Sequence, residues 1–228
     1  MSIYDFKPDR HSSHRKIIRH IIKLNKKGLR ILDIGCSKGF IGKQLSKNNE
    51  FYGIEISKDD AKIAKKYYKK IIIADLDRAK PKYKADFFDA IIMTDVIEHL
   101  KDPIGTMAHF KKFLKDDGIM IISVPNVANT YVRLKLLFGN FDYETRGILD
   151  NTHLRFFTLK SFRAALKKAG LIIIKEEATP VPFQLVNPIF SQKGPLSFLY
   201  HAYYLLVLAW KKMFAFQFIA YCVKQDEN

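Results

Sequence analysis

The sequence predicts an α/β protein built on a parallel sheet. Short apolar runs alternate with helical patterns from the N-terminus to about residue 125. Strands that are apolar on both faces and separated by helices are typical of a parallel sheet covered on both sides. Of the 228 residues, 48% are hydrophobic and 27% are charged, so the chain can enclose a core and wholesale disorder is excluded.

The N-terminal half begins with an amphipathic pattern, because isoleucines recur at helical spacing among arginines and lysines before Gly28. Two short apolar segments follow, the first ending in Gly35 and the second in Glu55. Ser57 then begins a capping-box pattern that opens another helix. The predicted helices here cover 11–26, 38–48 and 57–68, and the predicted strands cover 30–35, 50–55 and 71–74.

The second half continues the alternation of strands and helices. Asp102 and Pro103 pair an N-cap residue with proline at the first helical position, and Thr158 caps a later helix that Gly170 ends. Residues 116–118 predict a turn before the fifth strand. The predicted helices here cover 102–114, 129–138 and 159–169, and the strands cover 87–93, 119–124, 171–175 and, with period-two alternation, 214–220.

The composition indicates which cellular compartment and which classes of binding partner to expect. Lys and Arg number 39 against 23 Asp and Glu, and the resulting charge of +16 suggests nucleic acid or an anionic membrane. The lysines are spread along the chain, however, which is also typical of a solvated surface. Cys36 and Cys222 are the two cysteines, which excludes a disulfide scaffold and a cysteine-built zinc site. Residues 1–10 lack an apolar signal region, so we expect a reducing, cytoplasmic setting.

The segment 194–210 is uncharged and lies between Lys193 and Lys211. Its length is at the bottom of the membrane-spanning range of roughly 17–25 residues, and it contains several polar positions, so a spanning helix is disfavoured. Two interpretations remain open. The segment forms a helix packed on the sheet, or an aromatic interfacial helix that gives the protein peripheral membrane contact.

Acidic residues follow four of the predicted strands, where open α/β sheets bind ligands. The first strand runs from Asp33 into a glycine-rich turn, whose glycines allow a tight turn and close approach to a ligand. Glu55 ends the second strand and suits the two hydroxyls of a ribose, because a carboxylate offers acceptors and no donor. Asp75 could accept from an adenine amino group, with Ile56 and Leu76 on either side of the ring. Asp95 follows the fourth strand.

Five segments together resemble one family. They are residues 31–39, 52–56, 74–76, 88–103 and 114–126. In this order they resemble the class I S-adenosylmethionine-dependent methyltransferases across roughly residues 28–177. The segment 153–158, His-Leu-Arg-Phe-Phe-Thr, is similar to a branch of that family acting on small molecules, quinone-like lipids or glycan precursors. Ser37 departs from the second glycine of many members, but serine is small and we expect the turn to be preserved.

The resemblance implies a Rossmann-like three-layer sandwich with a seven-stranded, mostly parallel sheet and an antiparallel edge hairpin. It implies one methyltransferase domain over 1–228, with an N-terminal amphipathic helix within 1–28 and acceptor-side insertions at 126–152 and 178–210. It also implies a binding role toward S-adenosylmethionine for each motif residue. Asp33 would hold the ammonium, Gly35, Ser37 and Gly39 the methionine part, Glu55 the ribose, Ile56, Asp75 and Leu76 the adenine, and Asp95 the sulfonium-bearing chain.

Methyl transfer to a hydroxyl is helped by a base within hydrogen-bond reach, and histidine suits neutral pH. We predict His153 as this base, with His99 second. Arg133 and Arg155 could hold an anionic acceptor, because arginine makes forked contacts. An alternative assigns metal binding to this region. The residues concerned are Asp95, Glu98 and His99, which share a face of a helical turn, together with His153.

The sequence therefore predicts O-methylation of a small-molecule, lipid-linked or glycan-type acceptor. An RNA methyltransferase is the alternative, because the chain is basic and has a basic helix over 10–27. A third interpretation is a non-enzymatic or membrane-associated module that keeps the fold alone. The sequence assigns neither a particular acceptor nor an oligomeric state.

Overall fold

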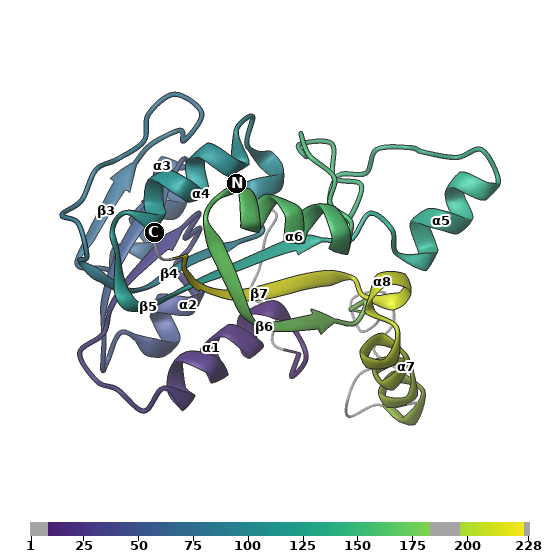
Figure 1. Cartoon of the computed structure of the whole chain (residues 1–228), viewed down its shortest axis with the longest axis horizontal. Helices are drawn as coiled ribbons and strands as arrows, with labels where there is room; N and C mark the ends of the chain where they lie inside the picture. Colours follow the sequence, from purple (N-terminus) through teal and green to yellow (C-terminus); the bar gives the residue numbers. More distant parts are fainter. Residues whose placement is uncertain (1–8, 183–196, 226–228) are drawn as a thin grey trace.

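A computed structural model describes residues 9–182 and 197–225, in which a seven-stranded sheet lies between two layers of helices (Figure 1). The strands are β1 (Arg30–Ile34), β2 (Glu50–Glu55), β3 (Lys70–Ile73), β4 (Phe88–Thr94), β5 (Leu114–Pro125), β6 (Leu171–Thr179) and β7 (Gln217–Lys224). The helices are α1 (Ser13–Lys23), α2 (Phe40–Leu45), α3 (Lys58–Ala64), the 3-10 turn η1 (Ile97–His99), α4 (Pro103–Lys111), α5 (Thr130–Leu137), α6 (Leu159–Lys168), α7 (Ser197–Ala209) and α8 (Lys211–Phe214).

The strand order confirms the predicted fold class. The sheet runs β3-β2-β1-β4-β5-β7-β6, and β7 pairs antiparallel with both β5 and β6 while the other pairs are parallel. The chain order reverses between β1 and β4, which places the carboxyl ends of these two strands beside each other at the switch point of the sheet. Ile34 of β1 lies in register with Met93 of β4, so the segments that follow both strands meet.

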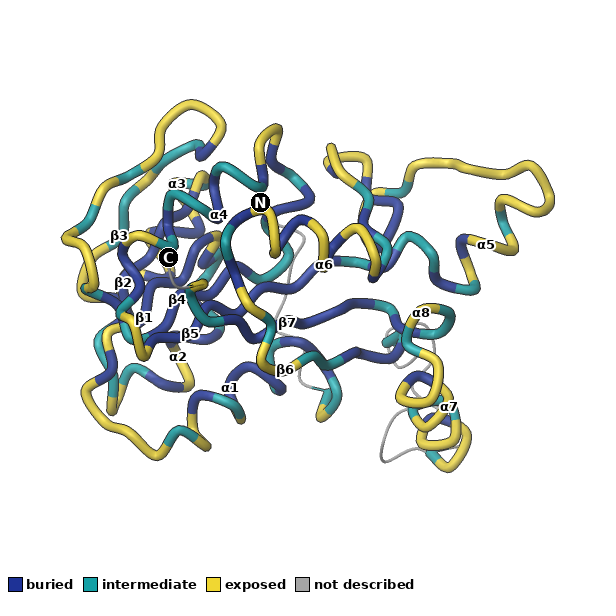
Figure 2. The backbone as a smooth tube through the Cα atoms, in the orientation of Figure 1, coloured by how far each residue is buried: buried dark blue, intermediate teal, exposed yellow. Residues whose placement is uncertain are grey.

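Each face of the sheet is covered by its own apolar layer. On one face, Phe110 of α4 and Phe162 of α6 pack with inward residues of the strands. On the other face, Ile17 and Ile21 of α1 pack with residues of α2 and with Tyr68, which follows α3. The strands accordingly form the buried centre in Figure 2, whereas the loops are exposed. Alternating inward and outward side chains along apolar strands thus produce a sheet buried on both sides.

Several predicted boundaries are wrong. Residues 116–118 do not break the chain into a turn before the fifth strand but form an irregularity within β5, where Phe88 pairs with Leu114 and Ala90 already pairs with Ile119. The last strand starts at Gln217 and not at residue 214, because residues up to Phe214 form the short helix α8. The first helix ends at Lys23 because Asn25 adopts a left-handed conformation with φ 50°.

The later helices are also shorter at their ends than predicted. The predicted 38–48, 57–68 and 102–114 are observed as α2, α3 and α4. Their starts follow the predicted signals, because Ser57 accepts a hydrogen bond from the Asp60 N–H and Asp102 accepts one from Gly105. Thr158 and Ser161 form the capping box of α6. Capping side chains therefore fix where helices begin, while the ends depend on tertiary packing.

The uncharged C-terminal segment forms α7 beyond residue 196, and the part of the 178–210 insertion over 183–196 lies outside the described residues. Helix α7 contacts the edge strand β6 and buries Tyr200 and Val207. Phe198, Leu205 and Leu206 of this helix are more than half exposed. Among residues 9–182 and 197–225, no helix combines the length and apolar character needed to cross a bilayer.

Candidate active site

A cavity of about 630 Å³ opens at the carboxyl ends of the parallel strands. This volume lies within the range of roughly 300–1,000 Å³ that holds nucleotide-sized ligands. The predicted cofactor residues that line it are Asp33, Gly35, Ser37, Glu55, Ile56, Asp75, Leu76 and Asp95. Gly39 does not line the cavity but lies at the N-cap of α2, immediately behind the turn. His14 of α1 and Phe40 of α2 also line it, and neither was a predicted site residue.

The turn after β1 requires left-handed backbone at three positions. Gly35 and Gly39 have φ 70° and 79°, and a Cβ on Gly35 would lie 2.5 Å from a methyl carbon of Val96. Ser37 has φ 46°, which a small side chain tolerates at a cost, and its N–H donates to Glu55 Oε2 at 2.8 Å. The turn is thus preserved with serine in place of the second glycine, as predicted.

Glu55 is almost fully buried at the end of β2, where three backbone N–H groups hold its carboxylate. Ile56 and Ser57 donate to Oε1 at 2.9 Å each, and Ser37 donates to Oε2 at 2.8 Å. A carboxylate offers about four acceptor positions, so one remains for a ligand hydroxyl. The carboxylate is therefore fixed in position before any ligand arrives.

Asp33 is 3% exposed at the floor of the cavity. The Tyr68 hydroxyl donates to its Oδ2 at 2.5 Å. The pKa of Asp33 is raised to about 7, chiefly because burial penalises the charged form. The Tyr68 hydrogen bond lowers this pKa, and the Glu55 charge raises it. Asp33 therefore changes charge near neutral pH and has a strong preference for a cationic partner. Tyr68 was not predicted as a site residue, because nothing in the local pattern directs it at Asp33.

The residues predicted to lie on the adenine side form a rim of the cavity. Asp75 Oδ1 accepts from the Asp77 N–H at 3.0 Å, and its other oxygen lies 3.2 Å from Arg78 Nε. Leu76 is buried beneath this rim, whereas Ile56 is 66% exposed although it lines the cavity. An apolar side chain left open in a polar cavity is suited to cover the face of a flat ring.

Asp95 follows β4 and is held by side chains of two other strands. It has φ 55°, Ser123 Oγ on β5 donates to Oδ1 at 2.7 Å, and Gln217 Nε2 on β7 donates to Oδ2 at 2.6 Å. These hydrogen bonds fix the orientation of the Asp95 carboxylate at the switch point of the sheet. Gln217 was not predicted, although a glutamine at the start of an otherwise apolar strand is a signal that could have found it.

His99 and His153 come together, with their ring centroids 4.8 Å apart, but His99 lines the cavity and His153 does not. His153 Nδ1 lies 3.0 Å from the Ile148 carbonyl, which can only accept, so Nδ1 carries the proton. The Thr152 hydroxyl donates to Asp150 at 2.6 Å, so His99 Nδ1 donates toward Thr152. Both rings therefore keep an Nε2 lone pair available.

Burial lowers the pKa of His153, and the neighbouring His99 lowers it further. Among the described residues, Glu98, His99 and His153 place one ligand atom each within 4.8 Å of one another, an arrangement that could hold a metal ion. Asp95 does not belong to this group, because its carboxylate is directed at Ser123 and Gln217.

The two predicted arginines lie outside the cavity lining. Arg155 donates to the carbonyl of Lys101 at 2.8 Å, and Arg133 donates to the carbonyl of Ala128 at 2.7 Å. Both guanidinium groups are exposed and stabilise local backbone in this conformation. Their predicted role toward an anionic acceptor stays a prediction.

Comparison with known proteins agrees with the geometry of the cavity. A family model described as a methyltransferase domain matches residues 9–176, so the chain belongs to this family. The chain is 25% identical to a ubiquinone biosynthesis O-methyltransferase of Actinobacillus pleuropneumoniae over 55% of this chain and 57% of that one. It is 26% identical to a protein of the same name from Haemophilus ducreyi, over 67% and 65% of the two chains. The match therefore spans less than two thirds of these relatives' own length.

Solved structures share the fold. A SAM-dependent methyltransferase from Archaeoglobus fulgidus matches with a TM-score of 0.63 and 18% identity over 94% of this chain and 95% of that one. Magnesium protoporphyrin IX methyltransferase from Synechocystis, solved with bound SAH, matches with a TM-score of 0.63 and 16% identity over 93% and 82%. The fold, the cavity and the family together define an S-adenosylmethionine-dependent methyltransferase domain.

Proposed function

We propose that the protein O-methylates a small-molecule, lipid-linked or glycan-type acceptor. The observation that carries this proposal is the cavity at the switch point, where Asp33, Glu55 and Asp95 converge from three strands. The relatives named ubiquinone biosynthesis O-methyltransferase support a small acceptor hydroxyl. When bound, S-adenosylmethionine supplies a methyl group on a cationic sulfur for in-line displacement.

We assign each cofactor contact to a residue whose chemistry fits it. Glu55 would accept from the ribose hydroxyls with the lone pair left by its three backbone donors. Asp33 would face the ammonium, and Asp95 would lie beside the chain that carries the sulfonium. Ile56 and Leu76 would contact the adenine faces, with Asp75 near its amino group. The protein mainly supplies alignment and exclusion of water to such a displacement.

The paired histidines would take the proton of the acceptor hydroxyl. His153, the favoured base, is kept neutral by burial and has a free Nε2, and His99 lies between it and the cavity. We expect His153→Gln and His99→Gln each to lower kcat by roughly 10²–10⁴-fold. S-adenosylmethionine affinity should stay unchanged in both variants, because neither side chain is assigned a cofactor contact.

The convergence of Glu98, His99 and His153 supports a second candidate mechanism, in which these residues hold a divalent ion that binds the acceptor oxygen. Exhaustive chelation followed by return of Mg²⁺, Mn²⁺ or Zn²⁺ separates the two mechanisms. Activity that is lost and then restored by metal assigns the cluster to metal binding. Activity that survives chelation assigns it to proton transfer.

We further propose that residues 126–152 and 178–210 form the acceptor side, with peripheral membrane contact through α7. The support is the exposed apolar surface of this helix, including Leu205 and Leu206, which Trp210 continues beside Lys211. Flotation with phosphatidylcholine vesicles tests the contact. Leu205→Ser/Leu206→Ser should lose flotation, and a wild-type protein that never floats would remove the membrane part.

Calorimetric titration with S-adenosylmethionine tests the central proposal first. Heat of binding is expected for the wild type and a strongly weakened signal for Glu55→Ala. Absence of binding at millimolar cofactor would remove the proposal. A screen with methyl-labelled cofactor then compares quinol-like phenols, glycan precursors and tRNA, and transfer to tRNA alone would favour the RNA methyltransferase alternative.

A further inference from the structure

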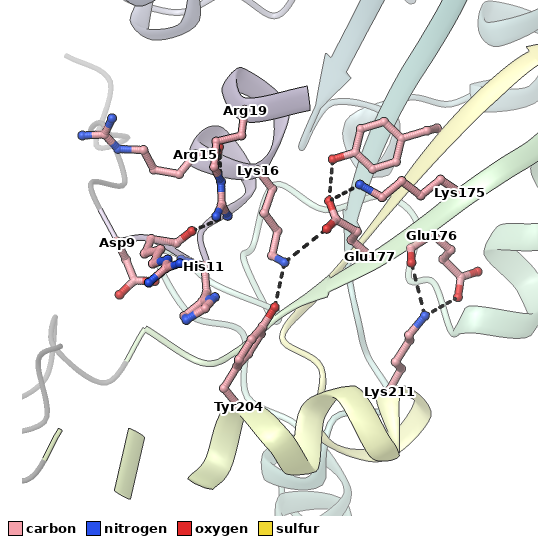
Figure 3. Close-up of polar contacts among 12 residues, drawn as sticks. Asp9, His11, Arg15, Lys16, Arg19, Lys175, Glu176, Glu177, Tyr204 and Lys211 are labelled. Atoms are coloured by element: carbon pink, nitrogen blue, oxygen red, sulfur yellow. Dashed lines mark hydrogen bonds and ion pairs between the residues drawn. The ribbon is translucent and has the colours of Figure 1, made fainter. Parts of the chain in front are cut away.

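A second cavity, of about 180 Å³, lies between α1, β6 and α7, and it shares no lining residue with the first. Figure 3 shows side chains from these three elements directed toward one another. The residues that line it are Arg10, His11, Lys16, Arg19, His20, Lys23, Lys175, Glu177 and Tyr204. Five of these side chains carry a permanent positive charge and one carries a negative charge, so the cavity is strongly cationic.

The single carboxylate is already shared. Glu177 accepts from the Tyr221 hydroxyl at 2.7 Å and lies 3.6 Å from Lys16 Nζ and 3.5 Å from Lys175 Nζ. No acidic side chain among residues 9–182 and 197–225 pairs with Arg10 or Lys23. The positive charge of the cavity therefore exceeds what its own residues neutralise.

The cavity is built around a buried lysine. Lys16 is 5% exposed, and its ammonium donates to the Tyr204 hydroxyl at 2.9 Å (Figure 3). Because an ammonium can only donate, the Tyr204 oxygen is the acceptor, and its own proton can be donated into the cavity. The ring of His11 stacks on Tyr204 with centroids 3.8 Å apart, which fixes the orientation of the tyrosine.

The two histidines that line this cavity, His11 and His20, have lowered pKa values. The pKa of His11 is lowered to about 4, chiefly because of burial. Asp9 raises this pKa, and the charges of Lys16, Arg10 and Arg19 lower it. Burial also lowers the pKa of His20, and Lys175 adds to this effect. Both rings are thus neutral at pH 7 and can donate a hydrogen bond without adding charge.

We propose that this cavity binds a phosphoryl group of a ligand other than the methyl donor. Its volume corresponds to about six water molecules at ~30 Å³ each, which suits a phosphate or pyrophosphate group and not a whole nucleotide. Arginine, lysine and tyrosine donors converging from three elements are the groups that recognise phosphoryl oxygens. The buried Lys16 supplies a fixed donor, and the exposed Arg10, which precedes α1, and Lys23, at the end of α1, add two further cationic groups to the lining.

The phosphoryl group could belong to a soluble phosphorylated molecule or to a lipid headgroup. A soluble phosphorylated molecule would bind through the cavity alone. A lipid headgroup would also bring the membrane surface against the exposed apolar side chains of α7, because Tyr204 of this helix lines the cavity. The experiment therefore has one arm for each source.

The first arm titrates the protein with inorganic phosphate and pyrophosphate in a calorimeter. The test variant is Arg10→Gln/Lys23→Gln. Both changed side chains are exposed, so we expect the variant to fold like the wild type. The matched control is Lys65→Gln/Lys66→Gln, which removes the same charge from exposed positions beyond α3. We expect the test variant to bind pyrophosphate at least roughly tenfold more weakly, a change of about 1.4 kcal/mol, and the control to bind like the wild type.

The second arm uses flotation with vesicles of phosphatidylcholine, with and without phosphatidic acid, whose headgroup is a phosphomonoester. Binding that requires phosphatidic acid and is lost in the test variant assigns a lipid source. Pyrophosphate binding without this lipid dependence assigns a soluble source. The proposal is overturned if the wild type binds neither probe, or if the test variant and the control weaken binding equally. Since no arm measures methyl transfer, the result is independent of the proposed function.

Discussion

At the scale of single residues, Asp33 is the clearest example of a side chain whose chemistry is set by its surroundings. The Asp33 carboxyl, which is almost fully buried near the end of β1, keeps its proton up to about pH 7, because burial penalises the charged form. The same burial strengthens its attraction to a cation once it is ionised. Asp33 is therefore suited to bind an ammonium group only when it gives up its proton.

This residue predicts a pH dependence of cofactor affinity. Between about pH 5 and pH 7, the affinity for S-adenosylmethionine should rise by up to tenfold per pH unit, because binding requires ionised Asp33. Calorimetry in two buffers of different ionisation enthalpy should show proton release on binding. Asp33→Asn should bind weakly, and its affinity should not depend on pH in this range. If the affinity of this variant rises with pH as it does in the wild type, the assignment is contradicted.

Asp33 also predicts how stability changes with pH in the absence of cofactor. The folded-state pKa lies above the unfolded value, so its contribution to stability is fully present below about pH 4 and is lost as the pH rises through about 7. Urea unfolding of the wild type between these values should show this decline. The decline should be smaller in Asp33→Asn, whose side chain does not titrate.

Gly35 predicts a steric effect at the same turn. Gly35→Ala should bind no S-adenosylmethionine and should lose about 1–2 kcal/mol of unfolding free energy or more, because the left-handed backbone and the contact with Val96 both oppose a Cβ. Gly139→Ala is the matched control, since Gly139 has φ 76° but nothing within 4 Å of a Cβ. Equal cofactor affinity in both variants would argue against the close approach at Gly35.

At the scale of elements, capping side chains fix where several of the helices start. The clearest case is α6, where the Thr158 hydroxyl accepts from the Ser161 N–H and Ser161 accepts from the Thr158 N–H. This exchange satisfies two backbone donors that would otherwise have no partner at the helix start. The helix then packs Phe162 and Leu166 onto the sheet.

Thr158→Ala should therefore lower the unfolding free energy by about 1 kcal/mol. The affinity for S-adenosylmethionine should not change, because α6 contributes no residue to the lining of the cavity. Thr158→Ser should retain most of the stability, since serine caps comparably. Chemical unfolding and calorimetry on the same samples measure both quantities.

At the scale of the whole molecule, the strand order concentrates acidic groups at one edge while cations gather elsewhere. Asp33, Glu55 and Asp95 meet in the first cavity because β1, β2 and β4 are neighbours with parallel carboxyl ends. The basic second cavity lies on another part of the molecule, where α1 meets β6 and α7. The net charge of +16, which is summed over the whole chain, therefore describes neither site by itself.

Cofactor binding should stabilise the whole domain, because the first cavity joins groups from four neighbouring strands and their loops. At a cofactor concentration 100 times Kd, the gain should be about 2.7 kcal/mol, seen as a rise in Tm. Glu55→Gln should lose most of this rise, because an amide nitrogen would face backbone donors. A full rise in this variant would contradict the role of Glu55.

The sequence by itself determined the fold class and which acidic residues line the first cavity. Apolar runs with period two or 3.6 are local patterns, and acidic residues at strand ends are carried to one edge by any parallel sheet. For this reason Asp33, Glu55, Asp75 and Asp95 could all be placed at a ligand cavity in advance. The helix starts followed from local caps in the same way.

Only the tertiary structure decided which distant side chains meet. The contacts of Tyr68 with Asp33 and of Gln217 with Asp95 join segments 35 and 122 positions apart in the sequence. The position of His99 between His153 and the cavity, and the convergence of α1, β6 and α7 around Lys16, are of the same kind. Such contacts depend on how the packed layers orient each side chain, and the hydrophobic pattern of a single segment does not predict that orientation.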